Sequence, residues 1–355
     1  MKIIIAKSIL ENILIHAIPF LEKKDASQIT SHIYINVQDS FLTIKATDYE
    51  IGFLVQTDTV NILQEGTITA NGRKFLDIIK ILQNDDITLE AIDDYLQITQ
   101  NQSKFKLPTF AYNQFPAFPK YDKNSKITIN SQILIDSLKK ITPTIDNNNP
   151  KFELNGALMD IQENKINFAS TDTRRLSVIS LDNTTNTTLS LILPKKAIIE
   201  IQKLFFDEIE IFYDEVNLVI TSQQYTFFTK LIDGEYPNYE RIIPKSIEYS
   251  LILPKNLFIK SLKQITTISN DIKLTFFEDT ITFESLSDDN IEAKTQITHQ
   301  TPFTKPFVMA VNSKYILDFL NVIDQTEFTI GLNETNSPFI LSQNNFKTII
   351  MPISL

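Results

Sequence analysis

One arrangement of residues occurs three times in this chain of 355 residues, and it limits the possible folds more than any other feature. Each copy opens with a short run of β-branched residues, then a polar or proline break, then an amphipathic run of helical periodicity. Leu10, Leu134 and Phe258 occupy the same place in this block and lie 124 residues apart. Three further blocks follow in the same order in each copy and predict strands, a second helix and a closing hairpin. The repeat therefore predicts three tandem copies of one α+β domain, each with a sheet and two helices.

The repeat also sets the expected domain boundaries and helices. Boundaries in polar, lysine-containing segments give domains of residues 1–122, 123–247 and 248–355. The six expected helices are Lys7–Lys24, Gly72–Leu82, Ser131–Pro143, Pro194–Leu204, Pro254–Thr266 and Asn312–Ile323. Pro194 and Asn312 stand where two of these helices begin, and both residue types favour helix N-termini.

Charge is divided unevenly between the expected helices and the rest of the chain. The net charge is −10, yet the six helices carry 15 basic and 6 acidic side chains. Solvated lysines on a surface helix are the ordinary explanation for one such helix. The same bias in all six helices indicates a positive surface suited to a polyanion. Lysine predominates over arginine there, so binding of phosphates without base readout is expected.

Composition excludes several kinds of site. The chain has no cysteine, which rules out disulfides, thiolate metal sites and a cysteine nucleophile. It has only three histidines and six glycines, and no glycine-rich phosphate-binding loop of the usual spacings. We therefore expect no metal and no cofactor. No signal peptide and no apolar run long enough to cross a membrane are visible, so a cytoplasmic protein is expected.

Two aspartates are candidates for a catalytic role. Asp48 and Asp172 sit in matched Thr-Asp pairs after a strand, where carboxylates could bind a metal or serve as acid and base. The favoured interpretation is that each caps the turn that leaves its strand. A metal-dependent enzyme built from repeats remains one alternative, and a monomeric peptide-binding scaffold is another.

Five strings resemble those of a known family. They are ATDYEIG (46–52), GRKFLDIIK (72–80), TDTRRLSV (171–178), DGEYPNYERIIP (233–244) and IIMPISL (349–355). Together with the whole-length repeat, they resemble the bacterial DNA sliding clamps, the beta subunits of DNA polymerase III. The resemblance implies a non-catalytic, head-to-tail homodimeric ring with helices inside and sheets outside. Such a ring encircles duplex DNA without sequence specificity. It tethers the replicative polymerase, the clamp loader and other DNA-processing proteins.

The resemblance and the helix charges together assign three sets of residues. Expected DNA-binding residues are Lys24, Arg73, Lys74, Lys139, Lys140, Lys151, Lys195, Lys196 and Lys263. An apolar groove for partner peptides is expected from Leu154, Thr171, Arg174, Arg175, Leu176, Pro237, Arg241, Ile242, Ile350, Met351, Pro352 and Ile353. The dimer interface is expected at Lys104, Phe105, Lys106 and Leu107, facing Thr267, Ile268, Asp288, Asp289 and Glu292. Thr173 and Arg174 depart from the Gly-His that the family often has, which leaves the preferred peptide open.

Overall fold

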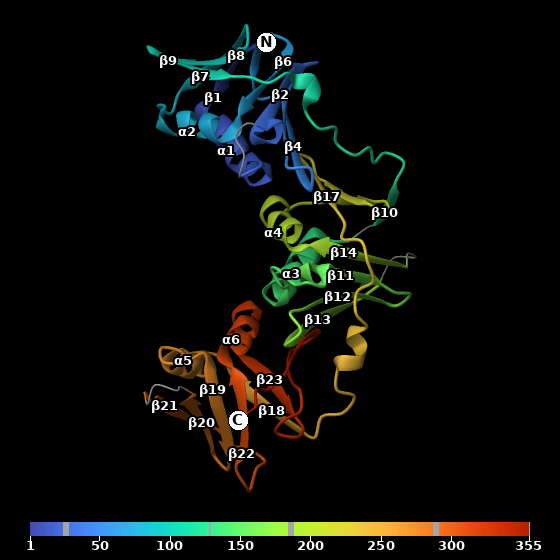
Figure 1. Ribbon diagram of the computed structural model, residues 1–355, viewed down its shortest axis with the longest axis vertical. Coiled ribbons are helices and arrows are strands. Elements are labelled where there is room, and N and C mark those ends of the chain that lie inside the picture. The colour runs from blue at the N-terminus through green and yellow to red at the C-terminus, as the bar shows by residue number, and fades with distance from the viewer. Residues whose placement is uncertain (24–27, 128, 184–187, 287–290, 355) are drawn as a thin grey trace. The chain divides into compact units, whose positions relative to one another are not determined.

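The computed structural model describes the chain except for residues 24–27, 128, 184–187, 287–290 and 355. The described chain divides into two compact units (Figure 1). Unit 1 comprises Met1–Leu134 and Ile199–Leu231, and unit 2 comprises Ile135–Ile198 and Ile232–Leu355. The boundaries pass through α3 (Ser131–Ile141) and α4 (Lys195–Leu204), so each unit holds one terminal repeat and part of the middle one.

Unit 1 contains two antiparallel sheets and the helices α1 (Lys7–Ala17) and α2 (Gly72–Ile81), which pack against each other. Its smaller sheet has the order β5-β1-β7-β8-β9, and its larger sheet has the order β10-β15-β16-β17-β4-β3-β2-β6. The smaller sheet consists of β1 (Lys2–Ala6), β5 (Asn61–Gln64), β7 (Asp86–Ile92), β8 (Tyr95–Gln100) and β9 (Ser103–Pro108). The larger consists of β2 (His32–Gln38), β3 (Phe41–Thr47), β4 (Ile51–Thr57), β6 (Gly66–Asn71), β10 (Ser125–Ile127), β15 (Glu210–Tyr213), β16 (Asn217–Thr221) and β17 (Tyr225–Lys230).

Unit 2 has the same kind of architecture, with the helices α5 (Lys255–Ile265) and α6 (Ser313–Val322) packed together. Its sheets have the orders β14-β11-β12-β13-β25-β24-β23-β18 and β21-β20-β19-β22. The larger consists of β11 (Gly156–Ile161), β12 (Lys165–Thr171), β13 (Arg175–Asp182), β14 (Leu189–Pro194), β18 (Tyr249–Pro254), β23 (Glu327–Leu332), β24 (Phe339–Gln343) and β25 (Phe346–Ile350). The smaller consists of β19 (Asp271–Phe277), β20 (Thr280–Ser285), β21 (Lys294–Thr298) and β22 (Phe307–Asn312).

Each larger sheet joins strands of two neighbouring repeats. In unit 1 the joint is the β4–β17 pair, with Gly52 opposite Phe228. In unit 2 it is the β13–β25 pair, with Leu176 opposite Ile349. Outward from each joint, equivalent strands of the repeats follow in the same order: β10-β15-β16-β17 corresponds to β18-β23-β24-β25, and β4-β3-β2-β6 corresponds to β13-β12-β11-β14. We call these pairs joint 1 and joint 2.

The predicted α+β class, tandem repeats, helices and closing hairpins are confirmed. The repeated position held by Leu10, Leu134 and Phe258 is buried in every copy. Asn312 is the N-cap of α6, and its side chain accepts a hydrogen bond from the backbone of Lys314.

The predicted first helix, Lys7–Lys24, was too long. The α-helix ends at Ala17, and a 3-10 turn, Ile18–Phe20, follows it. Pro19 explains the change, because proline has no N–H to continue the helical hydrogen bonds and its ring crowds the preceding turn.

Joint 1 depends on a glycine. A Cβ built on Gly52 would lie 2.0 Å from Cε1 of Phe228, whose side chain is only 5% exposed and has little room to move. We expect Gly52→Ala to cost about 1–3 kcal/mol of folding free energy, as for other overpacked sites. Thermal unfolding monitored by calorimetry measures the change. In a Phe228→Leu background the same substitution should cost less, because the smaller side chain leaves space; an equal cost in both backgrounds would contradict this explanation.

Candidate functional site

Joint 2 brings together most segments of the expected partner groove. Arg175 and Leu176 of β13 pair with Ile350 and Ile349 of β25. The backbone N–H of Met351 donates to the carbonyl oxygen of Arg174 at 2.9 Å, which extends the contact past the end of β25. The turn before β13 and the chain end after β25 therefore lie side by side, as the sequence analysis expected.

An apolar cluster lies at this joint. It consists of Leu158, Ala169, Leu176, Val178, Ile192, Ile232, Tyr239, Ile340 and Ile349, with Tyr236 and Ile243 packed against it. The linker from β17 to β18 thus covers part of the sheet through Tyr236, Tyr239 and Ile243, none of which the sequence analysis named. The run Tyr236-Pro237-Asn238-Tyr239 could have indicated this packing from the sequence, because two aromatic rings around a proline suit a segment that packs on a sheet.

The expected groove residues differ in what they expose. Leu154, Leu176 and Ile350 are buried and form part of the interior. Ile242 and Met351 are 44% and 40% exposed, so they offer apolar surface. Arg174 and Arg241 are also exposed, whereas Thr171 is buried and Pro237, Pro352 and Ile353 are half-buried. Ile353 forms an isolated bridge with Ala310.

Two tyrosines of the linker have polar ends inside this region. Tyr239 Oη donates to Asp160 Oδ2 at 3.3 Å, and burial together with that carboxylate raises the pKa of Tyr239. Burial likewise raises the pKa of Tyr236. Both phenols therefore stay neutral over the physiological range. Tyr239 fixes the linker by packing and by its hydrogen bond to Asp160, and Tyr236 does so by packing.

The Thr-Asp pairs form turns, which confirms the favoured interpretation. Asp172 Oδ1 accepts hydrogen bonds from the backbone of Arg174 and Arg175, and Asp48 Oδ1 does so from Glu50 and Ile51. In both turns the preceding threonine hydroxyl donates to a carbonyl oxygen four residues on, at 2.8 and 2.6 Å. No group of three or more metal-ligating side chains occurs among the described residues.

Arg175 is buried beneath the groove. Its Nε donates to Asp172 Oδ2 at 2.9 Å, its Nη1 to Asp318 Oδ2 at 2.7 Å, and its Nη2 to the carbonyl oxygen of Pro143 at 2.7 Å. The guanidinium also lies 4.5 Å from the ring centre of Tyr315. Since each of its three side-chain nitrogens donates a hydrogen bond, Arg175 ties β13 to α6 and to the turn after α3.

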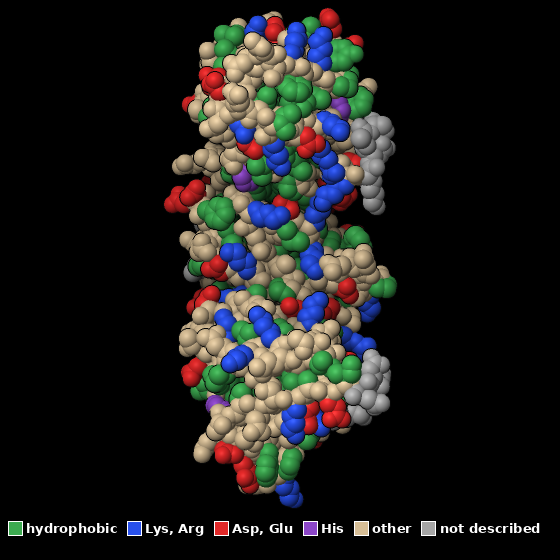
Figure 2. Space-filling view, turned by 90° about the vertical axis from the view of Figure 1, so that its left-hand side faces the viewer, with side chains coloured by type: hydrophobic (Ala, Val, Ile, Leu, Met, Phe, Trp, Pro, Cys, Tyr) green, Lys and Arg blue, Asp and Glu red, His purple; other side chains and the backbone are tan. Residues whose placement is uncertain are grey.

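The expected DNA-binding residues lie mostly on exposed helix surfaces. Arg73, Lys74, Lys139, Lys151, Lys196 and Lys263 are exposed, Lys140 and Lys195 are half-buried, and Lys24 lies outside the described residues. The six helices, as their bounds now stand, carry 13 basic and 5 acidic side chains. Figure 2 shows a face on which Lys and Arg side chains gather in each unit. The bias read from the sequence therefore persists with the observed helix bounds.

Lys195 differs from the other expected DNA-binding residues. Its Nζ donates to the carbonyl oxygen of Ile145 and to Asn147 Oδ1, both at 2.7 Å. Burial lowers its pKa. The ammonium is thus held against the loop after α3, where its first role is structural.

The expected dimer residues of the first repeat lie on an edge strand. Within the described residues, β9 pairs only with β8. Lys104 and Lys106 are exposed on β9, Phe105 is half-buried and Leu107 is buried.

On the third repeat, Thr267, Ile268 and Glu292 are exposed, and Asp288 and Asp289 lie outside the described residues. The edge strand there is β21, which in the described part of the chain pairs only with β20. The sequence analysis did not identify this strand. Its Lys294 pairs with Glu284 at 3.2 Å, so acidic and basic groups both occur near this edge.

No helix formed by the described residues is long and apolar enough to cross a membrane.

The fold and the two joints define a class: a chain of three tandem clamp domains. Family models for the N-terminal, central and C-terminal domains of the DNA polymerase III beta subunit match residues 1–119, 128–238 and 240–354. The chain belongs to this family, the bacterial beta sliding clamps, which are non-catalytic processivity factors.

Individual relatives agree with this assignment. The beta sliding clamp of Helicobacter pylori is 41% identical, with both chains covered completely, and that of Staphylococcus aureus is 26% identical over 92% of each. A crystal structure of the Helicobacter pylori beta clamp bound to a DNA ligase peptide matches with a TM-score of 0.94 over both whole chains. The DNA polymerase III beta subunit of Pseudomonas aeruginosa, 22% identical, shares the fold with a TM-score of 0.93.

The Arg175 contacts lead to a stability prediction. Arg175→Ala leaves two carboxylates without their partner, and we expect a loss of about 3 kcal/mol, or roughly 6 °C or more in melting temperature. Calorimetry measures this loss. The exposed neighbour provides a matched control, since Arg174→Ala should change the melting temperature little. Equal effects of the two substitutions would show that the buried contacts do not hold the joint.

Proposed function

We propose that this chain is a DNA sliding clamp that closes head to tail with a second copy into a ring around duplex DNA. The observation that carries the proposal is a pair of strand edges, on β9 and β21, for which the described part of the chain supplies no partner strand. Strand β9 is the last strand of the first repeat, equivalent to β17 in the second and β25 in the third. Strand β21 of the third repeat is equivalent to β4 in the first and β13 in the second. Joints 1 and 2 pair these same two kinds of strand. The β9 edge of one copy and the β21 edge of another are therefore suited to a third joint of the same kind.

The basic helices support a sliding mode of binding. Lysine ammonium groups attract phosphates at any base sequence, so they hold DNA loosely without fixing a register. Arg73, Lys74, Lys139, Lys196 and Lys263 are the exposed helix positions that we assign to this contact, with Lys151 beside them. Retention on DNA would then come from ring closure, and salt would weaken the contacts without releasing the ring.

The groove at joint 2 is the proposed tether for partner proteins. Ile242 and Met351 expose apolar surface beside the buried cluster, an arrangement suited to a short apolar peptide. The Helicobacter pylori clamp has been crystallised with a DNA ligase peptide. By that likeness we propose that the polymerase, the clamp loader and other DNA-processing proteins dock here through such peptides.

We further propose domain boundaries at 122/123 and 247/248, in the segments that link the repeats. A protein that loads onto chromosomal DNA is expected to work in the bacterial cytoplasm.

Topological retention tests the ring directly. The protein is loaded on a nicked circular DNA with clamp loader and ATP, the loader is removed, and the DNA is then cut once. In salt high enough to screen phosphate contacts, we expect stable retention on the circle and rapid loss from the linear form. Equal loss from both forms would refute the ring and leave a salt-dependent binder or the monomeric scaffold.

The proposed third joint is tested through Phe105. Phe105→Ala removes apolar area at the β9 edge and should weaken each of the two contacts of the ring by about 1–2 kcal/mol. In sedimentation equilibrium, the average mass of the variant should fall toward that of the 40.7 kDa monomer at concentrations where the wild-type chain is still a dimer. Phe41→Ala, which truncates a 44% exposed phenylalanine on β3, is the matched control and should leave the dimer unchanged. A wild-type chain that stays monomeric at micromolar concentration would contradict the dimer itself.

A further inference from the structure

The linker between the first two repeats forms an aromatic strap across the larger sheet of unit 1. We define the strap as residues 109–124, between β9 and β10. Four of its rings pack in turn on rings of β2, β17 and β15, with centroid distances between 4.3 and 5.3 Å. The pairs are Phe110 with His32, Phe115 with Tyr34, Phe118 with Phe228, and Tyr121 with Phe212. The strap therefore covers joint 1 much as the second linker covers joint 2.

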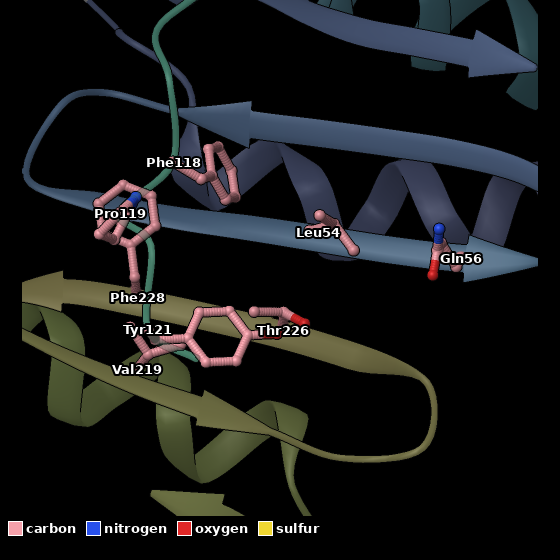
Figure 3. A pocket seen from close by; sticks show the side chains of 8 residues that line it. All are labelled: Leu54, Gln56, Phe118, Pro119, Tyr121, Val219, Thr226 and Phe228. Carbon is pink, nitrogen blue, oxygen red and sulfur yellow. The ribbon is translucent and has the colours of Figure 1, made fainter. Parts of the chain in front are cut away.

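A pocket remains open between the strap and joint 1. It has a volume of about 170 Å³. Its walls are Leu54, Gln56, Phe118, Pro119, Tyr121, Val219, Thr226 and Phe228 (Figure 3). An apolar cavity of about 150 Å³ is large enough for benzene, so this one is large enough for a phenyl ring.

The pocket and the apolar cluster of joint 2 occupy equivalent places in the repeat. Leu54 precedes Val178 by 124 residues, and Val219 and Phe228 precede Ile340 and Ile349 by 121. The registers agree as well, because Leu54 faces Thr226 across joint 1 as Val178 faces Lys347 across joint 2.

The linkers carry a shared motif. An aromatic residue, a proline, any residue and a second aromatic residue occur as Phe118-Pro119-Lys120-Tyr121 in the first linker and Tyr236-Pro237-Asn238-Tyr239 in the second. The two sites are thus built from corresponding strands and similar linkers.

Positive charge borders the pocket. Lys45 on β3 faces Leu54 directly, and its Nζ lies 5.5 Å from the ring centre of Phe118 and 5.3 Å from that of Tyr34. Lys45 is half-buried, and no carboxylate of the described residues lies within ion-pair distance of it. On the strap, the exposed Lys120 and Asp122 flank Tyr121 and carry opposite charges, so Lys45 is the cation on which the argument depends. An acidic group bound beside the apolar pocket would give Lys45 the partner that it lacks.

We propose that this pocket is a second peptide-docking site, which takes the aromatic side chain of an acidic peptide segment of a partner protein, with a carboxylate of the peptide on Lys45. Each chain would then offer two anchor points, one at each joint. The inference rests on the repeat, the pocket and the charge, and it does not depend on ring closure or on DNA binding.

Methyl NMR of the full-length protein, labelled at Ile, Leu and Val methyl groups, tests the site. The probe is a capped hexapeptide, Gly-Asp-Phe-Asp-Asp-Gly. Leu54 and Val219 report on the pocket, and Val178 and Ile349 report on joint 2. We expect the peptide to shift the Leu54 and Val219 methyl signals. The same peptide with asparagine in place of each aspartate should bind at least fivefold more weakly, roughly the effect of one partly exposed ion pair.

Two variants and one control sharpen the test. Thr226→Trp fills the pocket and should abolish the shifts at Leu54 and Val219, while unchanged Val178 and Ile349 signals show that the fold is retained. Lys45→Gln should weaken binding roughly fivefold, whereas the matched Lys347→Gln at joint 2 should not.

Shifts confined to Val178 and Ile349 would overturn the second site and leave the proposed function intact. The absence of shifts at all four methyl positions would also overturn the second site.

Discussion

The pairing of strands across repeat boundaries is the interaction on which the rest of this structure depends. A repeat alone would leave the edges of two strands without a neighbour, and both larger sheets exist only because β17 joins β4 and β25 joins β13. Both joints are antiparallel and share one register, which the matching alternation of buried side chains in the repeats sets. The groove, the pocket under the strap and the unpaired β9 and β21 edges all follow from this single mode of contact.

The two joints reach the same backbone arrangement with different side chains. At joint 1 one strand supplies nearly all of the side-chain volume, since Gly52 of β4 faces the large ring of Phe228 of β17. At joint 2 it is shared between Leu176 and Ile349. Joint 2 adds the buried Arg175 and its carboxylates, whereas the equivalent position at joint 1 is Ile51. Hydrogen bonds to a buried cation demand a fixed geometry, so the groove at joint 2 has a more firmly held floor.

Much of the fold could be read from the sequence because the repeat supplies three examples of each element. Where a proline or asparagine marks the start of a helix, the predicted start lies within one residue of the observed one. The predicted first helix is too long because Pro19, within an apolar run, ends the α-helix. The turn function of Asp48 and Asp172 could be predicted, since short-range hydrogen bonds depend on local sequence.

Features that depend on distant residues could not be read in this way. Nothing near Lys195 in the sequence shows that Ile145 and Asn147 hold its ammonium. The burial of Arg175, the edge position of β21 and the pocket under the strap likewise depend on strands far apart in the chain.

The exposed lysines of β9 have a consequence for newly made chains. An unpaired strand edge invites growth into open filaments, because any similar edge can extend it. Lys104 and Lys106 would meet their own counterparts if two β9 edges came together, and the repulsion between like charges would oppose that pairing. The two ammonium groups thus oppose wrong pairing of chains before the dimer has formed.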